Sequence, residues 1–156
     1  MFSEEQAEIG KDGDFQIASE YRGDFAYLFY PNFIFPGTVK ENILCGRKFV
    51  PEVYHEIEKI LQLPPANKEV ITKPENLSLG EKQKIFLARI LVGDHQFLLL
   101  DEPGSNLDDQ TEKNFARELE YRKKEKLIMV ISHNKIYDEI ADQIYIIQDG
   151  VMQRKR

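Results

Sequence analysis

Short apolar runs alternate with amphipathic stretches along the second half of the chain. Residues 97–100 (FLLL) and 127–131 (LIMVI) contain no polar residue, which is typical of buried strands. Residues 25–30 (FAYLFY) form a third apolar run, as expected of a strand buried on both faces, and residues 143–148 predict a further strand that ends at a hairpin-turn signal, DG at 149–150. Strands that alternate with helical patterns predict an α/β domain with a largely parallel sheet.

Two capping boxes predict where helices begin in the middle of the chain. Thr38 and Glu41 stand three residues apart, so that each side chain can bind the backbone N–H of the other, and a short helix to about residue 44 follows. Ser78 and Glu81 repeat this spacing and open a helix that continues through KQKIFLARILV. The inner face of this second helix is expected to consist of Ile85, Ala88 and Leu91 or Val92.

A proline and an aspartate mark two further helix starts. Pro51 suits a first helical position, and Asp108 is placed to cap a helix over residues 109–122. The helix that follows Pro51 is expected to bury Val53, Ile57, Ile60 and Leu61. We therefore expect one domain, with residues 1–32 and 93–156 in the core sheet part and residues 33–92 as an inserted subdomain, all-helical from about residue 38.

Composition and charge narrow the class of protein. The chain has 156 residues, enough for one domain, and its net charge of −6 argues against a nucleic-acid partner. The single cysteine, Cys45, allows no internal disulfide, which favours a reducing compartment. Because Cys45 follows two apolar residues, we expect it to be buried. No apolar run reaches the roughly 18–20 residues that a membrane-spanning helix needs.

Two carboxylates end the strand at residues 97–100. Asp101 and Glu102 would lie at the carboxyl edge of the sheet, where ligands bind in open α/β folds. There Asp101 can hold Mg²⁺ and Glu102 can accept a proton from an attacking water. His133 follows the next strand and is expected at the same edge. For the Asp-Glu pair alone, a strand followed by a polar turn explains the sequence better.

The motifs LSLGEKQ, FLLLDE, SNLD and SHN, in this order, resemble those of the ATP-binding cassette (ABC) ATPases. The resemblance runs from about residue 7 to the end of the chain and implies a P-loop NTPase-type fold. Residues 34–43 (IFPGTVKENI) are similar to a segment typical of exporter-type members, which faces the transmembrane partner. The resemblance thus implies ATP binding and hydrolysis coupled to export.

The same resemblance gives the signature motif a role at the start of a helix. Ser78 and Gly80, with Leu79 and Glu81 in the motif, would contact the γ-phosphate of an ATP bound to the opposite subunit. The first backbone N–H groups of a helix are free, and its dipole favours an anion at that end. LSLGEKQ is therefore expected to bind phosphate in trans.

The remaining site residues are also implied by the resemblance. Glu102 would be the general base, Asp101 the carboxylate on the Mg²⁺ side, and His133 the γ-phosphate sensor. Ser105 and Asp108 belong to the SNLD loop, which would cross the dimer interface. The implied cofactors are ATP and Mg²⁺.

Three features depart from the family pattern. No GxxxxGK[ST] occurs in the sequence, so the loop that holds the β- and γ-phosphates is missing, and the chain is expected to begin just after it. Tyr30 stands where the family has its Q-loop glutamine, and tyrosine is a poor ligand for magnesium. Leu79 replaces the first glycine of the signature. We therefore expect little or no ATP hydrolysis by the chain alone.

The expected partners are a second nucleotide-binding domain, in a homo- or heterodimer, and the transmembrane domain of an exporter. The chain would then be cytoplasmic, at the inner face of the membrane. One alternative is a non-catalytic subunit that supplies signature residues in trans to an intact cassette. Two others are half of a split head from a DNA-repair or chromosome-organising ATPase, and an inactive remnant of an interrupted gene.

Overall fold

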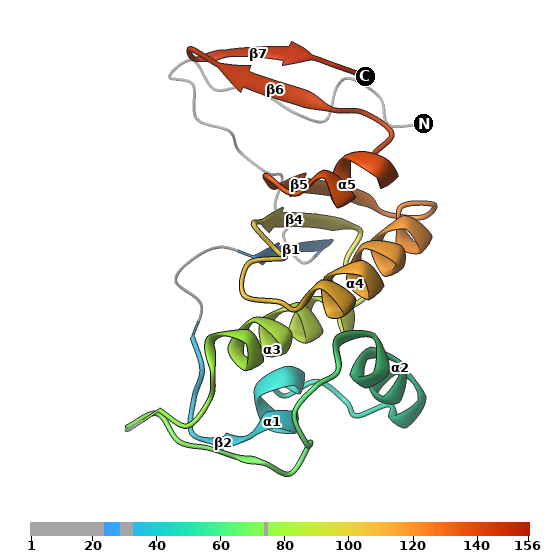
Figure 1. The fold of residues 1–156 in the computed structure, drawn as a ribbon. Helices are drawn as coiled ribbons and strands as arrows, with labels where there is room; N and C mark the ends of the chain where they lie inside the picture. The colour runs from blue at the N-terminus through green and yellow to red at the C-terminus, as the bar shows by residue number, and fades with distance from the viewer. Residues whose placement is uncertain (1–23, 29–32, 74) are drawn as a thin grey trace, which may run out of the picture.

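The computed structural model describes residues 24–28, 33–73 and 75–156 (Figure 1). Its elements follow in this order: β1 (Phe25–Leu28), β2 (Gly37–Thr38), α1 (Val39–Leu44), α2 (Pro51–Leu61), β3 (Glu69–Val70), α3 (Leu79–Leu91), β4 (Phe97–Asp101), α4 (Asp109–Arg122), β5 (Leu127–Ile131), α5 (Lys135–Ile140), β6 (Tyr145–Gln148) and β7 (Val151–Arg154).

The central sheet is parallel, with strand order β1-β4-β5. Its register aligns Leu28 with Leu100 and Asp101 with Ile131. All three strands therefore point the same way, and the loops that follow β4 and β5 leave from one edge. The predicted α/β fold with a parallel sheet is confirmed.

The two faces of this sheet differ in exposure. On the inner face Leu28, Leu98 and Leu100 are buried, in one core with residues of α3 and α4, which lie on that side (Figure 1). The outer face carries apolar side chains that are largely exposed, namely Tyr27, Leu127, Met129 and Ile131. Within the described part, the prediction that β1 is buried on both faces is therefore wrong, and so is the expected burial of β5 on this face, because both long helices of the core pack on the inner face.

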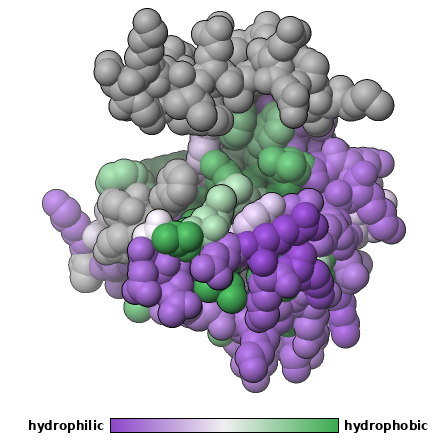
Figure 2. Space-filling view, turned by 90° about the horizontal axis from the view of Figure 1, so that it is seen from above, coloured by the Kyte–Doolittle hydropathy of each residue, from purple (hydrophilic) through white to green (hydrophobic). Residues whose placement is uncertain are grey.

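Hydrophobic surface is concentrated rather than scattered. Seen from above, hydrophobic residues gather in the middle of the molecule, and hydrophilic residues dominate the adjoining side (Figure 2). The hairpin of β6 and β7 lies at the opposite end of the molecule from α1 and α2 (Figure 1). Its two turn residues, Asp149 and Gly150, have φ of 51° and 75°, which is the left-handed conformation that the DG signal predicts.

The middle of the chain is helical but not all-helical. The short strands β2 and β3 pair antiparallel, with Gly37 opposite Val70. The backbone N–H of Val39 then donates to the carbonyl of Lys68 over 3.0 Å, which holds the connector between α2 and α3 against the start of α1. Strands of two residues are too short to show a period in the sequence, and they were therefore not predicted.

The predicted helix starts are confirmed, and one predicted helix face is wrong at a single residue. Thr38 and Ser78 each form a complete capping box, and Asp108 caps α4 at the predicted residue. In α2, however, Val53 is exposed, and Tyr54 is buried in its place beside Ile57 and Leu61. The first buried residue of α2 is thus Tyr54 and not Val53, one position later than predicted.

The predicted burial of Cys45 is wrong. Cys45 is exposed and adopts a left-handed conformation, with φ of 48°, as the residue that ends α1. Its Sγ donates to the carbonyl of Asn42 over 3.2 Å, so the thiol turns back onto the helix end. Within the described ranges, none of the helices has the length and hydrophobicity needed to cross a membrane.

Candidate functional site

The start of α3 is a turn with free backbone donors. The Ser78 hydroxyl accepts from the N–H of Glu81 over 3.1 Å, and the N–H of Ser78 donates to Glu81 Oε2 over 2.9 Å. Among the described residues, none accepts a hydrogen bond from the backbone N–H of Leu79 or Gly80. These two amides and the positive end of the helix dipole favour an anion at this turn.

Glu81 is held by a lysine from the connector. Lys68 Nζ lies 2.5 Å from Glu81 Oε1. Burial alone would raise the pKa of Glu81, but the bonds from Lys68 and from Ser78 outweigh it and lower the pKa. The carboxylate is therefore charged and fixed on the helix side of the turn, and it leaves the Leu79 and Gly80 amides free.

Leu79 and Gly80 occupy different environments. The side chain of Leu79 is 66% exposed, so it projects away from the domain. A methyl group on Gly80 would lie 2.7 Å from the backbone oxygen of Asn106, closer than real contacts allow. Glycine at position 80 therefore permits close packing of α3 against the loop after β4, whereas position 79 has no such limit.

Helix α3 is fastened to the loop that connects β4 to α4. Gln83 Nε2 donates to the carbonyl of Pro103 over 2.8 Å, and Lys84 Nζ lies 3.2 Å from Asp108 Oδ2. Together with the contact between Gly80 and Asn106, these bonds hold both ends of the loop to the first two turns of α3. The LSLGEKQ turn and the SNLD loop therefore form one surface.

The carboxyl edge of β4 and β5 brings two predicted residues together. His133 Nε2 lies 3.7 Å from Glu102 Oε1, and the Ser132 hydroxyl donates to Glu102 Oε2 over 3.3 Å. The imidazole of His133 is fully exposed. Glu102 has a φ of 43°, a left-handed conformation that is rare for residues other than glycine, while its N–H donates to the carbonyl of Ile131.

Asp101 and Ser105 lie on either side of Glu102. Asp101 is the last residue of β4 and is exposed. Ser105 is exposed too, and its N–H donates to the carbonyl of Glu102 over 3.1 Å. The polar groups of this loop therefore face outward from one edge of the sheet.

Asp108 has a structural task within the same loop. Its carboxylate accepts from the N–H of Thr111 over 2.9 Å and from the Thr111 hydroxyl over 2.7 Å. These two bonds, assisted by Lys84, hold the pKa of Asp108 well below its usual range. Asp108 is thus an ionised helix cap as well as part of the surface that faces outward.

Asn134 and Glu112 lie at this edge and were not predicted as site residues. Asn134 Nδ2 donates to Glu112 Oε2 over 2.8 Å, and the N–H of Asn134 donates to the Ser132 hydroxyl over 3.1 Å. They connect α4 to the segment after β5 that carries His133. The only signal in the sequence is that Asn134 can cap a helix, and α5 is too short to show a period. Tyr30, the remaining predicted residue, lies outside the described residues.

A metal at this edge would need ligands beyond the side chains. In the described part of the chain, no group of three or more His, Cys, Asp or Glu side chains is arranged to hold a metal ion. Magnesium characteristically binds through one or two carboxylates together with water and substrate phosphates. The exposed carboxylate of Asp101, next to Glu102, fits that role.

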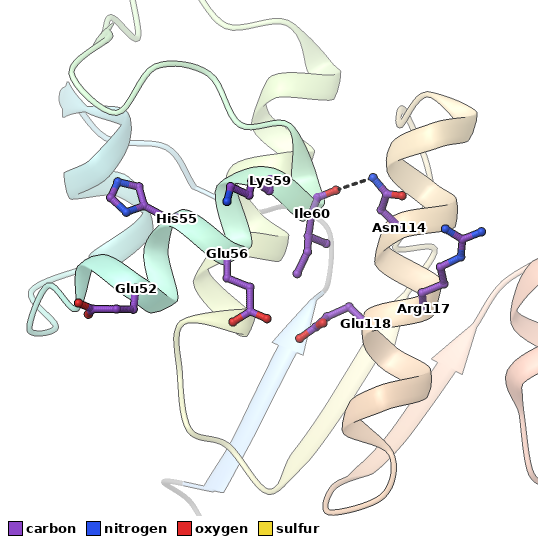
Figure 3. Close-up of a pocket in the computed structure, with 8 residues that line it drawn as sticks. All are labelled: Glu52, His55, Glu56, Lys59, Ile60, Asn114, Arg117 and Glu118. Carbon is purple, nitrogen blue, oxygen red and sulfur yellow. Dashed lines mark hydrogen bonds between the residues drawn. The ribbon is translucent and has the colours of Figure 1, made fainter.

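A separate groove lies between α2 and α4. It has a volume of about 510 Å³, and eight residues line it, among them His55, Lys59, Asn114 and Arg117 (Figure 3). Asn114 Nδ2 donates to the carbonyl of Ile60 across it, over 3.4 Å. None of the predicted site residues lines this groove, so it is distinct from the surface formed by α3 and the loop after β4.

Comparison with known proteins relates the chain to a protein family. A family model described as "ABC transporter" matches residues 2–105. A protein of Haemophilus influenzae named "Probable ABC transporter ATP-binding/permease protein" is 36% identical over 140 residues, covering 84% of this chain and 25% of the relative. An "ATP-dependent lipid A-core flippase" of Vibrio vulnificus is 32% identical over 170 residues, covering 97% of this chain and 28% of the relative. The chain thus spans about a quarter of the length of these relatives.

Proposed function

Because the chain belongs to the ABC transporter family, we propose that it is an ATP-binding module of an exporter, which presents its signature turn and its carboxylate edge to ATP at an interface with a second nucleotide-binding domain. The observation that carries the proposal is the set of contacts that hold α3 against the loop after β4, made by Gly80, Gln83 and Lys84. Because of these contacts, the free amides of the turn and the polar loop lie on one surface.

The signature turn would bind the anionic end of the nucleotide. The Ser78 hydroxyl already accepts one hydrogen bond and can donate its own hydrogen to a phosphate oxygen. The amides of Leu79 and Gly80 add two more donors at the positive end of α3. The exposed side chain of Leu79 leaves these donors accessible.

The carboxylate edge would prepare the attacking water. When bound, ATP with Mg²⁺ supplies the phosphoryl group and the charge that stabilises its transfer. Glu102 would accept a proton from the water, and Ser132 holds its carboxylate through Oε2. His133, 3.7 Å from Glu102, would contact the γ-phosphate, and Asp101 would face the metal.

The membrane side of the module would be the segment that precedes α1. Residues 33–38 lead into α1, and the ring of Phe33 is 78% exposed. We expect a transmembrane domain to contact this segment, which places the chain at the cytoplasmic face of a membrane. The names of the relatives from Haemophilus and Vibrio, a permease and a flippase, support an exporter.

A second candidate function is to supply the signature turn in trans to an intact cassette. The observation that favours it is an imbalance within this sequence: the Ser78 turn is fully formed, but no GxxxxGK[ST] is present. In this case ATP would be held by the loop of the other subunit, and only the signature turn of this chain would reach it.

Mixing with an intact nucleotide-binding domain tests both candidates. The chain is added to such a domain, for example that of the Haemophilus relative, and the ATPase rate is measured. We expect the rate to rise, and Ser78→Arg to abolish the rise, because the arginine side chain fills the space for the phosphate. Glu125→Arg, an exposed change just after α4, is the matched control and should preserve the rise.

Glu102→Gln separates the two candidates. If the edge of this chain hydrolyses ATP, Glu102→Gln lowers the stimulated rate by several orders of magnitude, as loss of a general base does. If only the signature turn acts, in trans, the stimulated rate survives Glu102→Gln and is lost in Ser78→Arg. No rise with the unmodified chain counts against both.

A further inference from the structure

Arg89, in the last turn of α3, connects this helix to the segment that precedes α1. Its Nε donates to the carbonyl of Asn42 over 2.5 Å, and one terminal nitrogen donates to the carbonyl of Phe33 over 2.7 Å. The other terminal nitrogen donates to Asn42 Oδ1 over 3.2 Å. One guanidinium thus binds three acceptors that lie 47 and 56 residues away in the sequence.

Asn42 is the buried partner of Arg89. Asn42 is fully buried, and besides the bond from Arg89 its side-chain amide is hydrogen-bonded to the segment 35–38. Oδ1 accepts from the N–H of Phe35 over 3.0 Å, while Nδ2 donates to the carbonyls of Phe35 and Thr38 over 2.8 and 3.1 Å. A buried amide with all its partners defines one conformation, because any other would leave polar groups unpaired. Asn42 therefore fixes the segment to α1.

The charge of Arg89 is held by carbonyl and amide oxygens. Within the described ranges no carboxylate pairs with it, and its acceptors are two carbonyls and one amide. Its guanidinium lies near the rings of Phe35 and Phe86, with centroid distances of 5.6 and 5.3 Å. Burial lowers the pKa of Arg89 from its ordinary value. Even a half-buried cation is costly to desolvate, so three directed bonds indicate a need for defined geometry rather than for charge pairing.

The two ends of α3 therefore have different contacts. The free amides lie at its start, after Ser78, and Arg89 lies eleven residues later, about 16 Å along a rigid helix. Beyond Arg89 lies Phe33, whose carbonyl is bound while its ring is exposed. A displacement of Phe33 would therefore be transmitted to α3 through the hydrogen bond from Arg89. A displacement of α3 would in the same way be transmitted to Phe33.

We propose that Arg89 is a positioning residue that fixes the segment 33–38, with the exposed Phe33, at a set distance from the phosphate-facing turn at Ser78. The tasks of the two ends, phosphate binding and partner contact, rest on the proposed function. The fixed distance itself is a property of this chain and is measured without nucleotide or partner.

Spin-label distance measurement tests the link directly. Labels are placed at Phe33→Cys and Ser78→Cys in a Cys45→Ser background, and a second pair at Lys113→Cys and Glu125→Cys serves as a reference within and just after α4. We expect one narrow distance distribution for the first pair. Arg89→Met and Arg89→Lys should at least double its width, since a lysine cannot bind three acceptors in the fork of a guanidinium.

Arg117→Met is the matched control, because Arg117 is an exposed arginine on α4. It should leave both distributions narrow. If Arg89→Met also broadens the reference pair, the domain has unfolded, and Arg89→Lys, which keeps the charge and most of the stem, decides the outcome.

An unchanged width between positions 33 and 78 in Arg89→Lys overturns the proposal. Failure of the proposed function gives a different result: the unmodified chain does not stimulate an intact domain, while the spin-label distances still respond to Arg89.

Discussion

The start of α3 and the outer face of the central sheet differ in how far their groups have partners within the domain. Around Ser78 and Gly80, the capping bonds and the bond from Gln83 to the loop after β4 fix the turn, and among the described residues only the amides of Leu79 and Gly80 are left without an acceptor there. The outer face, with Leu127 and Met129, is apolar and more than half exposed at both residues. Hydrogen-bonded turns need only nearby groups, whereas an apolar sheet face gains free energy only when something covers it.

The difference shows that the surface formed by α3 and the loop after β4 does not depend on the outer face of the sheet. The surface formed by α3 and the loop after β4 takes its geometry from contacts between Gly80, Gln83, Lys84 and residues 103–108. None of these contacts involves the outer face. The part that would act on a nucleotide held by another subunit is therefore independent of the sheet's outer side.

The largest expected effect compares the two faces of the sheet. Leu98→Ala removes a fully buried side chain and should lower the free energy of unfolding by about 2–5 kcal/mol. Leu127→Ala, the same change at a residue that is 60% exposed, should cost less than about 1 kcal/mol. Urea denaturation measures both. Equal losses of free energy of unfolding in the two variants would show that the outer face is buried in solution, and they would contradict the difference between the two faces.

A smaller effect is expected at the start of α3. Gly80→Ala forces a methyl group against the backbone oxygen of Asn106, and overpacking of this kind costs about 1–3 kcal/mol. Leu79→Ala, at the neighbouring exposed position, should change the free energy of unfolding by about 0.5 kcal/mol or less. Equal, small effects of the two changes would mean that α3 is not held tightly against the loop after β4.

The smallest effect concerns the charge of Asp108. Its pKa is lowered in the folded state, so its contribution to stability is present above the unfolded pKa of about 3.9 and is lost as the pH falls below it. Asp108→Asn keeps a capping side chain but removes the charge, so near pH 7 it should be less stable than the unmodified chain. Between about pH 4 and pH 2 the unmodified chain should lose more stability than Asp108→Asn in acid titrations followed by circular dichroism. Parallel acid losses would contradict an ionised cap.

Local signals in the sequence predicted much of the fold. The capping boxes at Thr38 and Ser78, the cap at Asp108 and the DG turn depend on residues within four positions of each other, and all four are found in the structure. The apolar runs predicted strands β1, β4 and β5 for the same reason. They did not predict exposure, because an apolar run shows that a strand can be buried but not what covers it.

The contacts that assemble the site were harder to predict. Strand ends in a parallel sheet share an edge, so Glu102 and His133 were expected together, and the structure places them 3.7 Å apart. The bonds from Gln83 to Pro103 and from Arg89 to Asn42 join residues 20 and 47 positions apart. No periodic pattern marks such pairs, and only the packed domain brings them together. The catalytic and binding roles of the predicted residues stay predictions.

The central proposal, that the Ser78 turn contacts a nucleotide at a domain interface, is tested most directly by photolabelling. An ATP analogue with a photoreactive group on its γ-phosphate is bound to an intact nucleotide-binding domain in the presence of this chain, and labelled peptides are identified by mass spectrometry. We expect label in the tryptic peptide that ends at Lys82, and its loss in Ser78→Arg. Label confined to the intact domain, or equal labelling of Ser78→Arg, would contradict the proposal.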